Sequence, residues 1–184
     1  ERFFADKEVD VSWAYTEKAR FRVNGYFQQG GIAFAMRLIP RSILTLEQLG
    51  LPPILESFTK RQQGFFLVVG PIGSGKSTTL ASLIEMINAS RAEHIMTIED
   101  PIEYVYEQKK SVIDQREVRL DTKDFRTALT SLFRQDIDVA LIGEMRDIDT
   151  ISAAVTAAET GHLVFSTLHT NNAAQTIERI IDVF

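Results

Sequence analysis

The stretch GPIGSGKS at residues 70–77 constrains the fold of this chain more than any other feature. It matches the pattern G-x-x-x-x-G-K-[ST] in full, with the apolar run FFLVV (65–69) before it and a helical stripe of apolar residues after it. Such a pattern forms a loop between a buried strand and a helix, in which backbone N–H groups surround phosphate oxygens. The glycines let the backbone aim those N–H groups inward, because glycine adopts conformations that other residues avoid. We therefore expect a phosphate-binding loop here.

Within this loop, two side chains have distinct expected roles. Lys76 supplies a positive charge for the β- and γ-phosphates, and Ser77 offers its hydroxyl to Mg²⁺. A GTPase would also carry an N/T-K-x-D motif that reads guanine, but the one similar stretch, TKDF at 122–125, ends in Phe125. The nucleotide is therefore predicted to be ATP. The predicted nucleotide-binding residues of the loop are Gly70, Pro71, Ile72, Gly73, Ser74, Gly75, Lys76, Ser77 and Thr78.

Strand and helix patterns alternate along the chain after residue 64. Short runs predict strands at 65–69, 94–99, 138–143 and 163–169. The run at 65–69 is expected to be buried on both faces, and that at 138–143 is also expected to be buried. Amphipathic stretches predict helices at 77–89, 122–135, 147–160 and from 173 onward. Asp121 is the expected N-cap of the second helix, and residues 112–120 are predicted to form a short hairpin or an extended excursion. This alternation favours an α/β fold with a mostly parallel sheet.

The chain before residue 64 has a different character. Three β-rich segments fall between residues 9 and 39, with a turn predicted at QQGG (28–31). Residues 42–62 have mixed polarity and predict a linker with a short helix on each side of the break at LPP (51–53). The predicted organisation is therefore a β-rich domain at 1–41, a linker at 42–62 and an α/β core at 63–184.

Composition bears on the class of function. The net charge of −5 argues against a dedicated nucleic-acid binder, and no apolar run approaches the ~20 residues that span a bilayer. The absence of cysteine excludes disulfides and thiolate metal sites. The chain begins without methionine and ends inside a helical pattern, so we expect it to be part of a longer protein.

Carboxylates follow two of the predicted strands. Glu99, Asp100 and Glu103 gather in TIEDPIEY (97–104), which should lie on the same edge of the sheet as the phosphate loop. One of them is expected to act as general base or to orient the attacking water, and their spacing does not rank them. An acidic surface turn is the alternative. Glu144, after the strand at 138–143, is expected to bind Mg²⁺ directly or through water, together with Ser77.

Two histidines, His162 and His169, flank the strand predicted at 163–169. They are seven residues apart, so on a regular strand they face opposite sides and a shared metal is not expected. His169 at the carboxyl end is a candidate sensor of the γ-phosphate. The alternative is that each histidine is a hydrogen-bonded structural residue.

Five motifs occur in a specific order, namely GPIGSGKSTT, TIEDPIEY, DQREV, LIGEMRD and TAAETGHLVFSTLHT. Together they resemble the type II and type IV pilus secretion ATPases, and most of all the PilT-type retraction (twitching motility) branch. The resemblance runs from about Ala19 to Phe184. GEMRD and DQREV favour this branch. The chain departs from the family pattern at Gly30, where many relatives carry arginine, and at DID (136–138), where the family has DPD.

The resemblance implies a RecA-like ATPase core preceded by part of a PAS-like N-terminal domain. It implies a homo-hexameric motor that hydrolyses ATP to ADP and phosphate with Mg²⁺ and powers pilus retraction. It places that motor at the cytoplasmic face of the bacterial inner membrane, bound to a platform protein, not inserted in the membrane and without nucleic acid. It makes Glu103 the catalytic base and Glu144 the Walker B glutamate. The further nucleotide contacts that it implies are Arg20, Arg22, Arg37, His162 and His169.

Three alternative functions follow from the same residues. A pilus-assembly or type II secretion ATPase of the same family would share all five motifs. A RecA-like nucleic-acid translocase would share the phosphate loop, although the acidic balance argues against it. A nucleotide-binding regulator without hydrolysis would not need the two further carboxylate sites.

Overall fold

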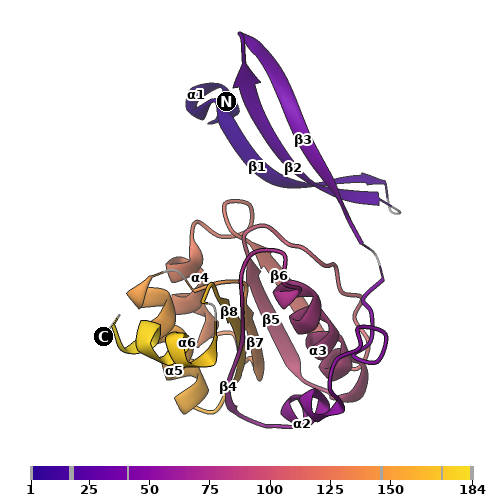
Figure 1. Ribbon diagram of the computed structural model, residues 1–184, viewed down its shortest axis with the longest axis vertical. Coiled ribbons are helices and arrows are strands. Elements are labelled where there is room, and N and C mark those ends of the chain that lie inside the picture. Colours follow the sequence, from indigo (N-terminus) through magenta and orange to yellow (C-terminus); the bar gives the residue numbers. More distant parts are fainter. Residues whose placement is uncertain (1, 17–18, 41, 146, 171, 183–184) are drawn as a thin grey trace. The chain divides into compact units, whose positions relative to one another are not determined.

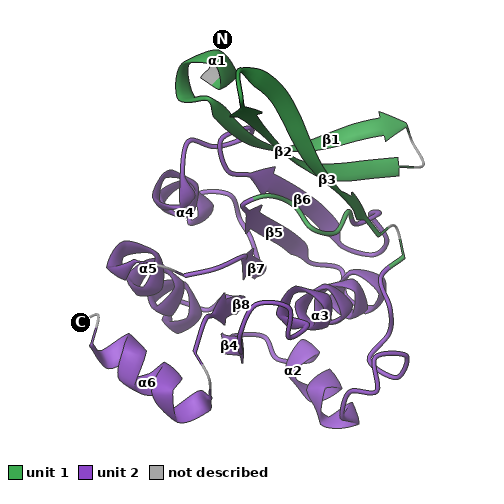
Figure 2. Ribbon diagram, turned by 45° about the horizontal axis from the view of Figure 1, so that its top comes forward, with its two compact units in different colours: residues 1–42, 101–105 green, residues 43–100, 106–184 purple. Residues whose placement is uncertain are grey.

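The computed structural model describes residues 2–16, 19–40, 42–145, 147–170 and 172–182. The chain forms two compact units (Figure 2). Unit 1 comprises residues 1–42 and 101–105, and unit 2 comprises residues 43–100 and 106–184. In the part of the chain that is described, no helix combines the length and the apolar character needed to cross a bilayer.

Unit 1 is a short helix followed by an antiparallel sheet. Helix α1 (Arg2–Asp6), which the sequence did not predict, precedes β1 (Glu8–Thr16), β2 (Ala19–Gln28) and β3 (Gly31–Ile39), paired in the order β1-β2-β3. The predicted turn between β2 and β3 is confirmed, and Gln29 and Gly30 have φ values of 47° and 78° there. A three-stranded antiparallel sheet is consistent with the predicted part of a PAS-like domain.

Unit 2 is built on a five-stranded sheet in which every pair of neighbours is parallel. Its strands, in spatial order, are β4 (Gly64–Val69), β8 (Leu163–Leu168), β7 (Val139–Ile142), β5 (His94–Glu99) and β6 (Val112–Glu117). The sheet is covered by α3 (Lys76–Ser90) and by α4 (Phe125–Leu132), α5 (Ile148–Glu159) and α6 (Ala173–Ile181). In Figure 1, α3 lies on one face and α4, α5 and α6 lie on the other. The predicted α/β fold with a parallel sheet is confirmed.

The core of unit 2 lies on both faces of this sheet. Strand β8 is buried at all six positions, and Phe165 in its middle has no exposed surface. The helical stripe predicted after the phosphate loop is also confirmed, since Leu83, Ile84 and Ile87 of α3 are fully buried. Burial of side chains of this size stabilises the fold by roughly 1.5–3 kcal/mol each.

Two predictions about strands needed correction. Of the two alternatives for residues 112–120, the hairpin was wrong: residues 112–117 are extended and form β6, which pairs with β5 in parallel from His94↔Val112 to Glu99↔Glu117. The periodicity of the segment could not reveal this, because parallel pairing joins residues that are distant in sequence. Strand β4 is half-buried at all six positions rather than buried on both faces, because it lies at one edge of the described sheet.

Two helix predictions also needed correction. The N-cap of α4 is Asp124, whose side chain accepts the Thr127 N–H, whereas Asp121 accepts the Glu117 N–H at 2.8 Å. The bonds from Thr127 lower the pKa of Asp124, because they stabilise its charged form. In the linker, the 3₁₀ helix η1 (Pro53–Leu55) and α2 (Glu56–Thr59) follow the LPP break, but only turns precede it.

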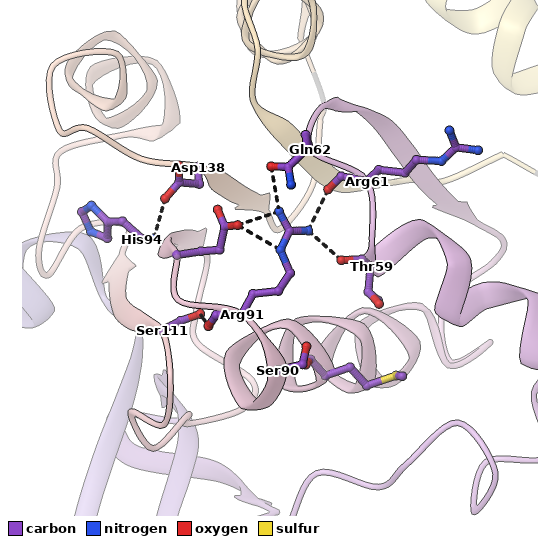
Figure 3. Close-up of polar contacts among 10 residues, drawn as sticks. Thr59, Arg61, Gln62, Ser90, Arg91, His94, Ser111 and Asp138 are labelled. Carbon is purple, nitrogen blue, oxygen red and sulfur yellow. Dashed lines mark hydrogen bonds and ion pairs between the residues drawn. The ribbon is translucent and has the colours of Figure 1, made fainter.

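Arg91, shown in Figure 3, bonds the end of the linker to the rest of unit 2. Arg91, directly after α3, donates through Nη1 to the carbonyls of Thr59 (2.6 Å) and Arg61 (2.7 Å). Its Nε and Nη2 both bond Glu93 Oε1, at 3.0 and 2.8 Å. Since the side chains of Arg91 and Glu93 are only 15% and 16% exposed, these bonds are shielded from water. Arg91 therefore satisfies carbonyls at the end of α2.

We expect Arg91→Met to lower the free energy of unfolding by about 2 kcal/mol, because two carbonyls and a carboxylate lose their shared donor. Urea unfolding followed by far-UV circular dichroism measures the change. The control is Lys60→Met, which removes the exposed pair with Glu56 (2.8 Å) and should cost less than about 0.5 kcal/mol. Equal losses in the two variants would contradict the assigned role of Arg91.

Candidate functional site

The loop between β4 and α3 has the backbone conformation that its glycines allow. Gly70, Gly73 and Gly75 have φ values of 153°, 78° and 88°. Gly75 is the N-cap of α3 in the left-handed region, and a Cβ there would meet nothing within 4 Å. Glycine is therefore required at this position by backbone conformation rather than by lack of space. Ser77 and Thr78 lie in the first turn of α3, and Ile72, in the loop, is 90% exposed.

The charge of the loop is concentrated at Lys76. This side chain is buried, and its Nζ donates to the carbonyls of Gly70 and Pro71, both at 2.9 Å. The ammonium group therefore lies against its own loop, next to the N-terminal end of α3. A helix N-terminus and a cation at one place favour a bound anion.

The carboxyl ends of β7 and β8 lie next to this loop, because β4 pairs with β8 and β8 with β7. Glu144 follows β7 and His169 follows β8; His169 Nε2 is 3.5 Å from Glu144 Oε2. The Glu144 side chain is 14% exposed and that of His169 is 45% exposed. Thr167 fixes this segment, since its Oγ1 donates to the Gly143 carbonyl (2.7 Å) and its carbonyl accepts the Met145 N–H (3.2 Å). Sequence reasoning did not single out Thr167.

The three carboxylates of TIEDPIEY have three different partners. Glu99 is buried at the end of β5, and its Oε1 accepts bonds from Thr97 Oγ1 (2.7 Å) and Gln115 Nε2 (3.3 Å). Asp100 pairs with Arg119 at 3.1 Å. Glu99 and Asp100 thus bind neighbouring strands and loops of unit 2. Gln115 and Arg119 were not predicted; Gln115 belongs to the DQREV motif, and nothing in the sequence marks Arg119.

Glu103 differs from the other two because its loop, 101–105, belongs to unit 1. Its Oε1 lies 3.4 Å from Arg22 Nη1 of β2. Arg22 is opposite Ser12 on one side and Arg37 on the other, so these side chains share one face of the sheet of unit 1. Arg20, two residues before Arg22, bonds Ser12 Oγ at 2.7 Å. All three predicted arginines therefore lie on the face that carries Glu103.

His162 lies away from the phosphate loop. It directly precedes β8, while the loop follows β4, which runs parallel to β8. Six strand residues, or about 20 Å, separate the two edges of the sheet. His162 Nδ1 is 3.0 Å from the Ala157 carbonyl, and its ring packs edge-to-face on Phe133. The predicted nucleotide contact of His162 is not supported within this unit, and the alternative of a structural histidine describes it.

The residues at the loop edge fit a magnesium–nucleotide complex. Ser77 presents a hydroxyl at the start of α3, and Glu144 presents a carboxylate from the adjoining strand end. In the described ranges, no three His, Asp or Glu side chains gather into a metal site of their own. Mg²⁺ is commonly held by one or two protein groups together with phosphate oxygens and waters. The donor set at this edge matches that mode of binding.

This phosphate loop on a parallel sheet defines a RecA-like P-loop nucleotide-binding core. A family model described as "Type II/IV secretion system protein" matches residues 2–183, and the chain belongs to this family.

Named relatives refine this class. The type IV pilus retraction ATPase PilT of Pseudomonas aeruginosa is 51% identical over 96% of the chain and 52% of its own length. A twitching motility protein of Neisseria gonorrhoeae is 54% identical over 96% of the chain and 47% of its own length. A crystal structure of the pilus retraction motor PilT with bound ADP superposes with a TM-score of 0.96, at 50% identity, over all of this chain and 53% of that one. The chain thus spans about half the length of these relatives.

We expect Gly75→Ala to weaken nucleotide binding by at least about 10-fold, because a left-handed φ is strained with a Cβ and relaxation redirects the loop N–H groups. Titration with a fluorescent ATP analogue measures the affinity. Gly161→Ala is the matched control: it also has a positive φ (110°), but it lies beside His162 at the opposite edge. It should lower the melting temperature without changing the affinity. Unchanged affinity in Gly75→Ala would contradict the assigned loop.

Proposed function

We propose that the chain forms part of a homo-hexameric motor that hydrolyses ATP with Mg²⁺ and powers type IV pilus retraction. The observation that carries the proposal is the convergence of the phosphate loop, Glu144 and His169 at one edge of a parallel sheet. Sequence identity of 51% and 54% to proteins named for pilus retraction and twitching motility supports it.

Each residue of the edge has a role in the proposed hydrolysis. Lys76 and the α3 N-terminus bind the phosphates and offset the negative charge that develops on them. Ser77 and Glu144 would hold Mg²⁺, which would neutralise phosphate charge there. Water attacks the γ-phosphorus, the bond to the β–γ bridging oxygen breaks, and ADP leaves. His169 contacts Glu144 and is suited to sense the γ-phosphate through it.

The proposed base is Glu103, which takes the proton of the attacking water. It lies four residues after Glu99, which ends β5 at the loop edge. Four residues reach at most about 14 Å, so the chain itself keeps Glu103 near this edge. Glu99 and Asp100 bond Thr97, Gln115 and Arg119 within unit 2, and it is the family resemblance that selects Glu103 from the three. Arg20, Arg22 and Arg37 supply positive charge to the same reaction.

Retraction is favoured over assembly by the degree of similarity. The assembly ATPase PilB of Acinetobacter baylyi is 38% identical over 95% of the chain, well below the two retraction-related proteins. We place the motor at the cytoplasmic face of the bacterial inner membrane, where a platform protein is its partner. Family membership supports this placement.

We expect Lys76→Ala and Glu103→Gln both to lower steady-state ATP hydrolysis by at least about 100-fold, because one removes phosphate charge and the other the base. Only Lys76→Ala should also weaken ATP binding. Phosphate release with Mg²⁺, and again with EDTA, measures both the activity and its metal dependence. Glu159→Gln, an exposed glutamate at the end of α5, is the control. Wild-type turnover in Glu103→Gln would rule out this base.

A cellular assay separates retraction from assembly. The full-length protein should restore twitching to Pseudomonas aeruginosa that lacks PilT, since a retraction motor acts on pili that already exist. Colony expansion and surface pilus counts are the measurements. Restoration of pili to a strain that lacks its assembly ATPase, without effect on twitching in the first strain, would instead identify an assembly motor.

A further inference from the structure

The loop that carries Glu103 connects two points of unit 2 but belongs to unit 1, as Figure 2 shows by colour. The residues on either side of it are fixed in unit 2. Asp100 pairs with Arg119 at 3.1 Å, and the Tyr106 N–H donates to Gln115 Oε1 at 2.9 Å. The loop between them, Pro101–Val105, groups with the N-terminal sheet. The printed ion pair of Glu103 with Arg22 therefore lies within unit 1, while the residues that flank its loop bond within unit 2.

One contact of Glu103 within unit 1 is the ion pair with Arg22, at 3.4 Å. Arg22 lies on β2, the middle strand of the sheet, where both neighbouring strands pair with it in register. Its backbone is therefore held on both sides. The side chains of Arg22 and Glu103 are 38% and 41% exposed. Pairs this exposed contribute little to folding stability, so the effect of this pair concerns where the carboxylate lies.

We propose that Arg22 is a positioning residue for Glu103, because their ion pair sets where the carboxylate lies. This inference rests on the proposed role of Glu103 as the base. A base must come within hydrogen-bond reach of the water that it activates, and a displacement of about 1 Å can cost 100-fold in rate. Arg22 ties the carboxylate to a strand that is paired on both sides, so loss of this side chain removes one restraint on the position of Glu103.

The test compares Arg22→Gln, Arg22→Lys and Arg37→Gln in the full chain. We expect Arg22→Gln to lower kcat about 5-fold with the KM for ATP changed less than about 2-fold, because placement of the base is lost and binding is not. Arg22→Lys, which keeps the charge, should recover at least about half of the kcat. A raised KM with unchanged kcat would overturn the inference, because it would make Arg22 a nucleotide ligand only.

Hydrogen exchange provides a readout that does not depend on hydrolysis. In Arg22→Gln the amides of residues 102–105 should exchange about 5-fold faster, because the loop has lost its tie to the sheet. Glu103→Gln should give a similar increase, and the double variant should add nothing to it. Arg37, directly opposite Arg22, gives the matched control: Arg37→Gln removes the same charge and should leave this exchange unchanged.

The outcomes separate the inference from the proposed function. Wild-type turnover in Glu103→Gln would refute the base, and the inference about hydrolysis would fall with it. Loss of turnover in Glu103→Gln, with normal kcat and normal exchange in Arg22→Gln, would refute the inference alone. Faster exchange in Arg37→Gln to the same extent would also refute it, because the effect would then reflect the charge of the sheet face rather than the ion pair.

Discussion

Parallel pairing of β4 with β8 and of β8 with β7 determines where chemistry can occur in unit 2. The three strands run in the same direction, and the phosphate loop, His169 and Glu144 follow their carboxyl ends. All three therefore lie at the same edge of the sheet. Strand β7 also pairs with β5, and the two backbones come close together at Gly143. A Cβ on Gly143 would lie 3.3 Å from the Ile98 carbonyl oxygen. The site therefore depends on backbone pairing before it depends on any catalytic side chain.

Much of this arrangement could be predicted from the sequence, because its signals are local. The phosphate loop has a fixed spacing between a strand and a helix, and the strand β5 and the helices α3 and α5 have their apolar periods inside single segments. The prediction failed where the decisive partner is distant. Residues 112–117 became a strand by pairing with β5, and β4 became half-buried through its place in the strand order. A local pattern contains neither fact.

The same limit applies to the three carboxylates of TIEDPIEY. Their spacing gave no ranking, and the structure distinguishes them by partners from elsewhere: Gln115 for Glu99, Arg119 for Asp100 and Arg22 for Glu103. Arg22 is separated from Glu103 by 81 positions, so no sequence pattern could join them. For His162, the resemblance to a family motif predicted a position at the nucleotide site. The residue precedes β8, so it lies at the edge of the sheet opposite the phosphate loop.

The two ends of helix α3 lie at two different features of unit 2. It starts at Lys76 in the phosphate loop and ends at Ser90, and the next residue, Arg91, holds the linker through the carbonyls of Thr59 and Arg61. Its 15 residues form a rod of about 22 Å that is stiff on the scale of side-chain contacts. The phosphate loop and the arginine that holds the linker are therefore joined by one continuous, well-packed helix.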